Sequence, residues 1–107
     1  MLTIRARVLG HDQWDRFTLG EIDANAAAAF SAKIKASGAA GPVRPGRTVL
    51  VKNNKTAFAY SAKGTKVDPK QCIGMWAVVE AEMTDFTPAC GQPSWYLRLY
   101  SMRFIDP

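Results

Sequence analysis

The run WYLRLYSMRFI, residues 95–105, is the longest uninterrupted stretch of strand-favouring residues in the chain. Successive side chains of a strand point to opposite faces. In its first half, one face is therefore apolar and carries Trp95, Leu97 and Leu99. The other face mixes rings with a guanidinium and carries Tyr96, Arg98 and Tyr100. Arg103 would break the apolar face, so a β-bulge near Ser101 is predicted to exchange the two faces there. Either the mixed face is a surface for stacking flat, anionic partners, or both faces are covered and the rings belong to the core.

The composition is that of a globular protein with a single domain, residues 1–107. Of these 107 residues, 48% are hydrophobic and 21% are charged, which is ordinary for a soluble fold. The net charge of +5 favours anionic partners. Residues 44–70 hold seven basic groups against Asp68 alone, whereas the other residues hold seven basic and eight acidic groups. The whole positive excess therefore lies in one quarter of the chain.

No catalytic motif occurs in the sequence, so we expect a protein that is not an enzyme and uses no cofactor or metal. His11 is adjacent to Asp12, but neighbouring residues in a turn are usually only solvated. Cys72 and Cys90 form no CxxC pair, so a structural zinc site lacks ligands. A disulfide between them and two buried reduced thiols both stay open. The N-terminus has no apolar signal-peptide core and no apolar run approaches membrane length, which predicts a cytoplasmic protein.

Alternation and turn residues predict the elements of the first half. Residues 2–8 alternate between apolar and polar side chains, and Gly10 to Gln13 forms a turn before a second strand at about residues 14–22. Asp23 is a good N-cap for a helix from Ala24 to about Ser37. We expect this slim, alanine-rich helix to plug one end of a barrel.

The second half is predicted to contain only strands and turns. A strand is predicted at residues 47–52. Asn53-Asn54-Lys55 should form a tight hairpin turn, because Asn tolerates positive φ, and a returning strand should follow at residues 56–63. Residues 71–86 are predicted to form another long strand, or a strand with a bend near Gly74, although a helix is the competing interpretation for residues 77–83. Its expected buried face carries Met75, Ala77, Val79, Ala81 and Met83.

Many strands with turns at short spacing predict a mainly β (α+β) fold. The expected form is a small barrel like the oligonucleotide-binding (OB) barrels, or a curved antiparallel sheet, with one helix near residues 24–37. The N- and C-terminal strands should lie in the same sheet.

Cations that track phosphates and rings on which bases stack are the combination that binds single strands without reading their sequence. Residues 52–66 have this combination, although a lysine-rich hairpin can also be a solvated edge that resists aggregation. Duplex recognition normally uses a helix, and the alanine-rich helix carries only Lys33 and Lys35, so single strands are favoured. The predicted nucleic-acid-binding residues are Arg5, Arg7, Lys52, Lys55, Phe58, Tyr60, Lys63, Lys66, Tyr96, Arg98 and Tyr100.

The segments WAVVEAEMTDF (76–86) and WYLRLYSMRFID (95–106) resemble the closing hairpin of phage and plasmid single-stranded DNA-binding proteins with OB folds. The resemblance implies that the protein coats single-stranded DNA in replication or recombination without reading its sequence. DNA is expected as the partner rather than RNA, and members of this family are often homodimers. The order of elements departs from that family. The helix of OB barrels commonly lies between the third and fourth strands, whereas here it follows the second.

The alternative function is a small phage-type protein-interaction module, or an inhibitor that acts on a host nucleic-acid machine. Its basic surface would bind an acidic groove, and Trp14 or Trp95 would anchor the interface. In either function, a long aromatic final strand is a poor exposed edge. Pairing it across a two-fold axis would protect it, so a homodimer is expected.

Overall fold

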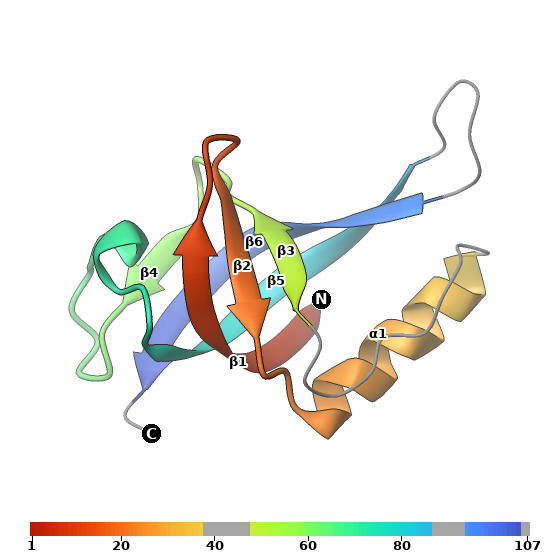
Figure 1. Ribbon diagram of the computed structural model, residues 1–107, viewed down its shortest axis with the longest axis horizontal. Coiled ribbons are helices and arrows are strands. Elements are labelled where there is room, and N and C mark those ends of the chain that lie inside the picture. The colour runs from red at the N-terminus through yellow and green to blue at the C-terminus, as the bar shows by residue number, and fades with distance from the viewer. Residues whose placement is uncertain (38–47, 87–93, 106–107) are drawn as a thin grey trace.

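Six strands and one α-helix make up the computed structural model, which describes residues 1–37, 48–86 and 94–105. The elements along the chain are β1 (Leu2–His11), β2 (Arg16–Gly20), α1 (Ala24–Ser37), β3 (Val49–Lys52), β4 (Phe58–Tyr60), the 3-10 helix η1 (Pro69–Gln71), β5 (Trp76–Phe86) and β6 (Ser94–Ile105). The mainly β fold class is confirmed (Figure 1).

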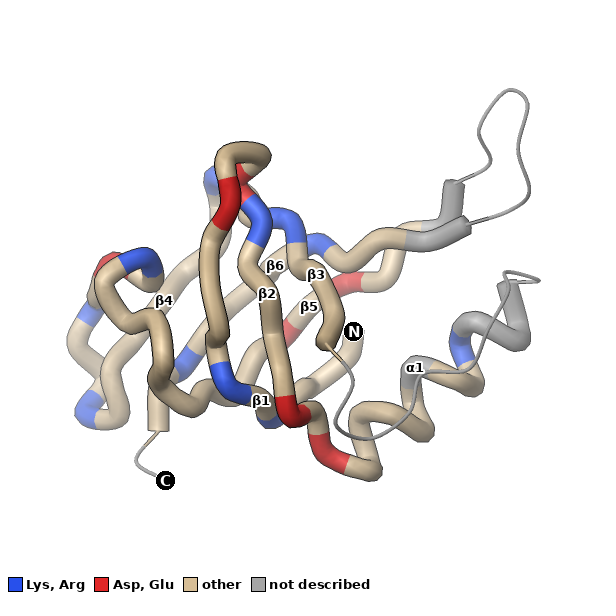
Figure 2. Tube along the Cα trace, in the orientation of Figure 1, with Lys and Arg blue, Asp and Glu red and all other residues tan. Residues whose placement is uncertain are grey.

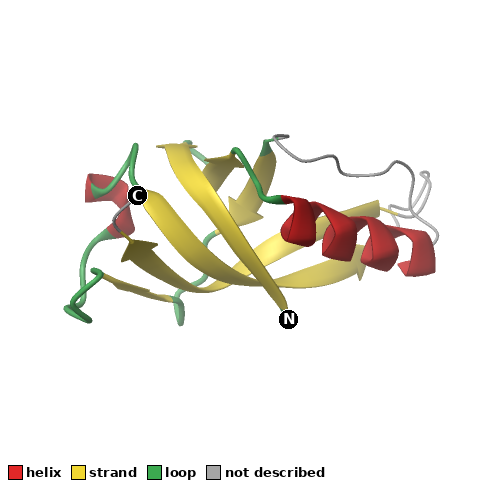
Figure 3. Ribbon diagram, turned by 90° about the horizontal axis from the view of Figure 1, so that it is seen from below, coloured by secondary structure: helices red, strands yellow, loops and turns green. Residues whose placement is uncertain are grey.

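The strands are joined into a closed ring of hydrogen bonds. β1 pairs antiparallel with β2 on one side and with β5 on the other, β2 pairs with β3, and β5 pairs with β6. The ring closes because β3 also pairs with β6, in the parallel direction. The result is a small OB-like barrel that holds the N- and C-terminal strands in one sheet, as predicted (Figures 1 and 3).

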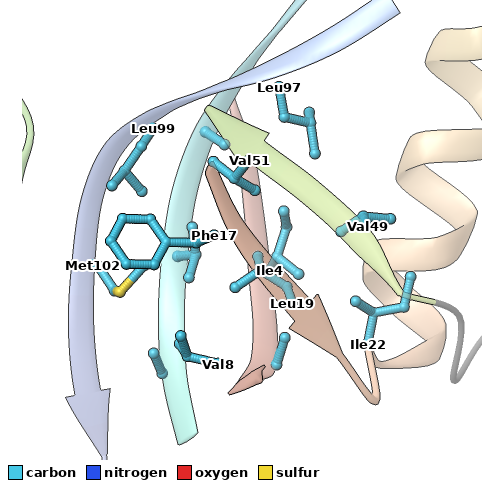
Figure 4. Packing of buried hydrophobic residues seen from close by; sticks show 14 of the residues in the cluster. Ile4, Val8, Phe17, Leu19, Ile22, Val49, Val51, Leu97, Leu99 and Met102 are labelled. Carbon is cyan, nitrogen blue, oxygen red and sulfur yellow. The ribbon is translucent and has the colours of Figure 1, made fainter. Parts of the chain in front are cut away.

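The core fills the inside of this ring (Figure 4). The alternation of β1 is confirmed, because its even-numbered residues from Leu2 to Val8 are buried and its odd-numbered ones from Thr3 to Arg7 are exposed. The largest side chains with almost no exposure include Phe17 from β2, Leu97 and Phe104 from β6. Each such side chain stabilises the fold by roughly 1.5–3 kcal/mol through burial.

A bulge in β6 exchanges its faces, as the sequence predicted. Glu80 pairs with Ser101 and Ala81 pairs with Leu99, which leaves Tyr100 as an extra residue on β6. Before the bulge the buried residues include Leu99, and after it they are Met102 and Phe104. The rings at Tyr96 and Tyr100 and the guanidiniums of Arg98 and Arg103 therefore all lie outside the barrel.

α1 begins where the sequence predicts. Asp23 caps it, since its Oδ1 accepts the Ala26 N–H at 2.7 Å and its carbonyl oxygen accepts the Ala27 N–H at 3.0 Å. Ile22, Ala26 and Ala27 are buried, so the start of the helix covers the core. From there α1 runs outward past the barrel (Figures 1 and 3). Within the part of the chain that the structure describes, α1 lacks the length and apolar character that a membrane-spanning helix requires, and no other helix has them.

The predicted hairpin at Asn53-Asn54-Lys55 is wrong. β3 and β4 both pair with β6 in the parallel direction, so they run the same way and do not pair with each other. The Ala57 N–H donates to the Asn54 carbonyl at 2.9 Å, which closes a turn that offsets the chain without reversing it. β4 then continues along β6 where β3 stops, and it spans only Phe58–Tyr60 rather than residues 56–63.

Two other boundaries differ from the prediction. β2 is shorter than residues 14–22, because positive φ angles at Asp15 and Glu21 place these two residues in turns. β5 begins at Trp76, after a bend at Gly74 whose φ of 95° suits glycine, so the bend is confirmed and the strand is shorter. Met75 therefore precedes β5 and is exposed rather than buried, and Met83 is only half-buried.

β6 is an interior strand of the sheet. It pairs with β5 along its length and with β3 and β4 at residues 97–98 and 101–103. The homodimer was expected because β6 was taken to be an exposed edge strand. That premise is wrong, because these residues of β6 are paired on both sides. The homodimer itself stays a prediction.

Candidate nucleic-acid interface

Three cations form a row across the outside of β2, β3 and β6. Arg16 is directly opposite Lys52, and Lys52 is directly opposite Arg98. Neighbouring strands lie roughly 4.8 Å apart, so the backbone positions of the row span about 10 Å. The basic positions of the three strands lie side by side in Figure 2. Lys52 and Arg98 are exposed and Arg16 is half-buried, so the row presents positive charge to solvent.

Exposed rings flank this row. Trp14, in the turn between β1 and β2, is 64% exposed, and the Arg16 guanidinium lies 5.0 Å from its ring centroid. Tyr96 and Tyr100 stand on the same side of β6 as Arg98, two residues before and after it, and both are exposed. We call Trp14, Arg16, Lys52, Tyr96, Arg98 and Tyr100 the basic–aromatic face.

Hydrogen bonds hold the β1–β2 turn in place. Asp12 accepts the N–H groups of Trp14 and Arg16, both at 3.0 Å, and Arg16 Nε at 2.8 Å. Desolvation alone would raise the pKa of the Asp12 carboxyl, but these bonds with Arg16 and Trp14 outweigh it and leave that pKa lowered. The turn thereby fixes the backbone from which the Trp14 ring projects.

A second network joins this turn to the loop after β3. Asp15 lies 2.6 Å from His11 Nε2, and its carboxylate accepts the Asn53 amide at 3.2 Å while its carbonyl accepts the Asn53 N–H at 2.9 Å. The next residue, Asn54, accepts Arg98 Nη2 at 3.4 Å. The contact with His11, then that with Asn53, lowers the pKa of Asp15. The network therefore ties three strands of the basic–aromatic face together.

The lowered pKa of Asp15 predicts how the stabilisation from this network depends on pH. A carboxyl whose folded pKa lies below its usual value stabilises the fold above that value and loses this contribution as the pH falls through the folded pKa. Asp15→Asn should therefore be less stable than the wild type at pH 6, by under about 1 kcal/mol because the pair is exposed. The difference should be smaller at pH 3, which lies below the ordinary carboxyl pKa of 3.8, because the stabilisation is lost as the pH falls from there through the lowered pKa of Asp15.

Urea unfolding of both proteins at the two pH values measures this difference. Asn tolerates the positive φ of 56° at position 15, so the substitution tests the charge rather than the backbone. An equal deficit at both pH values would contradict the role of the carboxylate.

The predicted residues of β4 and its loops lie further along β6. Phe58 and Tyr60 stack with their centroids 6.3 Å apart, and Lys66 Nζ lies 5.7 Å from the Phe58 centroid. Phe58 is opposite Ser101 and Tyr60 is opposite Arg103, so these rings continue the outer surface beyond Tyr100. The remaining two lysines of this segment are exposed, Lys55 in the loop before β4 and Lys63 in the turn after it.

Arg5 and Arg7 lie elsewhere. They point outward from β1, and β5, which carries Glu80 and Glu82, separates β1 from β6. Arg7 Nε donates to the Gly74 carbonyl at 2.9 Å, which holds the bend before β5. Arg5 lines a hollow of about 360 Å³ beside the carboxylates of Glu21 and Asp23. The structure does not bring these two arginines together with the basic–aromatic face.

The sequence-based site omitted residues that the structure places on this surface. The predicted site did not include Arg16 or Arg103. Arg16 follows the turn before β2 and Arg103 follows the bulge in β6, and these two features decide which side of the strand faces outward. Trp14 was assigned only to the protein-interaction alternative, as an interface anchor, and its high exposure suits a stacking role as well. Cys72 carries a free, half-buried thiol, whereas Cys90 lies outside the described residues. Among the described residues, no group of three or more His, Cys, Asp or Glu side chains could hold a metal ion.

Comparison of the chain with protein-family models, with curated proteins and with solved structures finds no match.

Proposed function

We propose that this protein binds single-stranded nucleic acid, DNA in preference to RNA, across the basic–aromatic face and without reading sequence. The observation that carries the proposal is the row of Arg16, Lys52 and Arg98 between exposed rings. Cations bind successive phosphates through counterion release, and each base that stacks on a ring contributes roughly 1–3 kcal/mol whatever its identity. An OB-like barrel supports this proposal, since its second and third strands and the loop after its first strand form a common oligonucleotide surface.

The single strand would cross the row from Arg16 to Arg98, so that successive phosphates meet the three cations, and would then turn along the outside of β6 toward Phe58 and Tyr60. Lys55, Lys63 and Lys66 border that second part and would add phosphate contacts. We further propose that the binding serves the coating of single strands in replication or recombination, in the cytoplasm. A duplex fits this surface less well, because its bases are already stacked on one another and cannot stack on the protein rings.

Fluorescence polarisation with a labelled single strand and the matching duplex tests the proposal. The single strand should bind more tightly than the duplex at low salt, and its affinity should fall as salt is raised because counterions compete for the phosphates. Absence of binding to the single strand at moderate salt, or equal affinity for the duplex, would contradict it. In that case a protein partner becomes the leading alternative.

A further inference from the structure

A hollow of about 470 Å³ opens on the outside of the barrel, over β4, β5 and β6. Its lining includes Tyr60, Val78, Glu80, Ser101, Arg103 and Ile105. It lies at the bulge, where Tyr100 is the extra residue opposite Glu80 and Ala81. A bulge bends its strand and re-aims the neighbouring side chains. The hollow also lies beyond the point where β3 has left β6 and β4 has taken its place.

The hollow combines an apolar floor with two unlike charges. Val78 and Ile105 are half-buried, and the half-buried ring of Tyr60 forms part of the wall. Glu80 is directly opposite Ser101, so Arg103 is its diagonal neighbour, at a distance of roughly 7–8 Å. Within the described residues, the structure records no ion pair or hydrogen bond for the side chain of Glu80 or of Arg103.

The half-buried Glu80 carboxylate keeps access to solvent, so a ligand that replaces this water with N–H donors would satisfy its two oxygens. The size of the hollow, its apolar floor and its few polar groups are typical of a small-molecule site. Glu80 offers two acceptor oxygens, and the exposed guanidinium of Arg103 offers the planar donor fork that suits phosphate. The ligand should therefore carry a flat ring with adjacent N–H donors at one end and an anion at the other.

We propose that this hollow binds a guanine nucleotide. Among the four bases, guanine alone presents two adjacent N–H donors, N1–H and N2–H, to a carboxylate. The base lies against Tyr60 and Val78, Glu80 accepts the two N–H groups, and Arg103 binds the 5′-phosphate. A free mononucleotide and the terminal guanylate of a strand offer the same chemistry. Tyr60 is shared with the path proposed for the single strand, whereas Glu80 and Arg103 lie off the basic–aromatic face, so the proposal does not rest on the function proposed above.

Titration calorimetry with 5′-GMP, 5′-AMP, 5′-UMP, 5′-CMP and guanosine tests the proposal. We expect 5′-GMP to bind at least about tenfold more tightly than 5′-AMP, because only guanine satisfies both carboxylate oxygens. Glu80→Gln should abolish this preference. Arg103→Gln should weaken 5′-GMP about tenfold and leave guanosine unchanged, since guanosine has no phosphate.

Matched controls remove the same charges outside the hollow. Glu82→Gln changes an exposed carboxylate on β5 that is opposite Arg98, and Lys70→Gln changes an exposed cation in η1. Both should bind 5′-GMP like the wild type. Equal affinity for all four nucleotides, or a Glu80→Gln variant that keeps the preference, would overturn the proposal.

Oligonucleotides that differ only in a 5′-phosphorylated dG or dA end identify the source of the ligand. A preference for the dG end that Glu80→Gln removes supports the end of a strand, whereas binding of 5′-GMP alone supports the free nucleotide. The experiments can reject the nucleotide site and the single-strand surface independently of each other. Loss of 5′-GMP binding with single-strand binding intact rejects only the hollow, and the reverse result rejects only the basic–aromatic face.

Discussion

Replacing Phe17 with alanine is expected to lower the free energy of unfolding by about 3–5 kcal/mol. Phe17 is 0% exposed and lies inside the barrel with Leu99 and Met102 (Figure 4). Its removal leaves a cavity that strands joined in a closed ring cannot readily collapse to fill. Urea unfolding followed by circular dichroism measures the loss.

Phe58→Ala is the matched control, because it removes the same ring from outside the barrel. Phe58 is 45% exposed, its ring stacks with that of Tyr60, and the Lys66 ammonium lies over it. We expect a loss of about 1 kcal/mol or less, as is usual for exposed positions and single ring pairs. Equal losses for Phe17→Ala and Phe58→Ala would mean that the inside and outside of the barrel are assigned wrongly.

The elements that could be predicted from the sequence are those set by local patterns. Alternation identified the buried side of β1, and a single polar residue in an apolar series, Arg103, indicated the bulge in β6. The cap at Asp23 depends only on the hydrogen bonds that a carboxylate makes one turn ahead, so it was equally visible. Such signals lie within a few residues of the feature that they predict.

The errors arose where distant strands decide the outcome. Asn53 and Asn54 have the composition of a hairpin turn, yet their side chains bind Asp15 and Arg98, and the chain continues forward. The reason lies in β6, which pairs in the parallel direction with β3 before its bulge and with β4 after it. Local turn propensity cannot report that requirement.

The candidate site shows the same division. Its cations and rings on β3, β4 and β6 lie on the outside of the barrel, because they alternate with buried residues there. The row of Arg16, Lys52 and Arg98 could not be predicted, since it depends on the register of β2 with β3 and of β3 with β6. Arg5 and Arg7 were grouped with it on charge alone, and the ring places β5 between them and β6.

Neutralising the row with Arg16→Gln, Lys52→Gln and Arg98→Gln should flatten the salt dependence of single-strand binding. Each phosphate contact on a single strand contributes about 0.7 to the slope of log K against log salt, so three lost contacts should reduce it by about 2. The affinity loss should be largest at low salt and should diminish as salt rises. Polarisation at four or more salt concentrations measures the slope. Circular dichroism checks folding, since Arg16 also pairs with Asp12.

A second triple variant, Arg5→Gln, Lys33→Gln and Lys70→Gln, changes the net charge equally but leaves the row intact. All three of these side chains are exposed and lie off the basic–aromatic face, so this variant should reduce the slope by less than about 1. Trp14→Ala should weaken binding by roughly 1–3 kcal/mol at every salt concentration and leave the slope unchanged, because stacking releases no counterions. If the two triple variants behave alike and Trp14→Ala has no effect, the protein attracts nucleic acid through net charge alone. If they separate as expected, phosphates bind at the row and bases stack beside it.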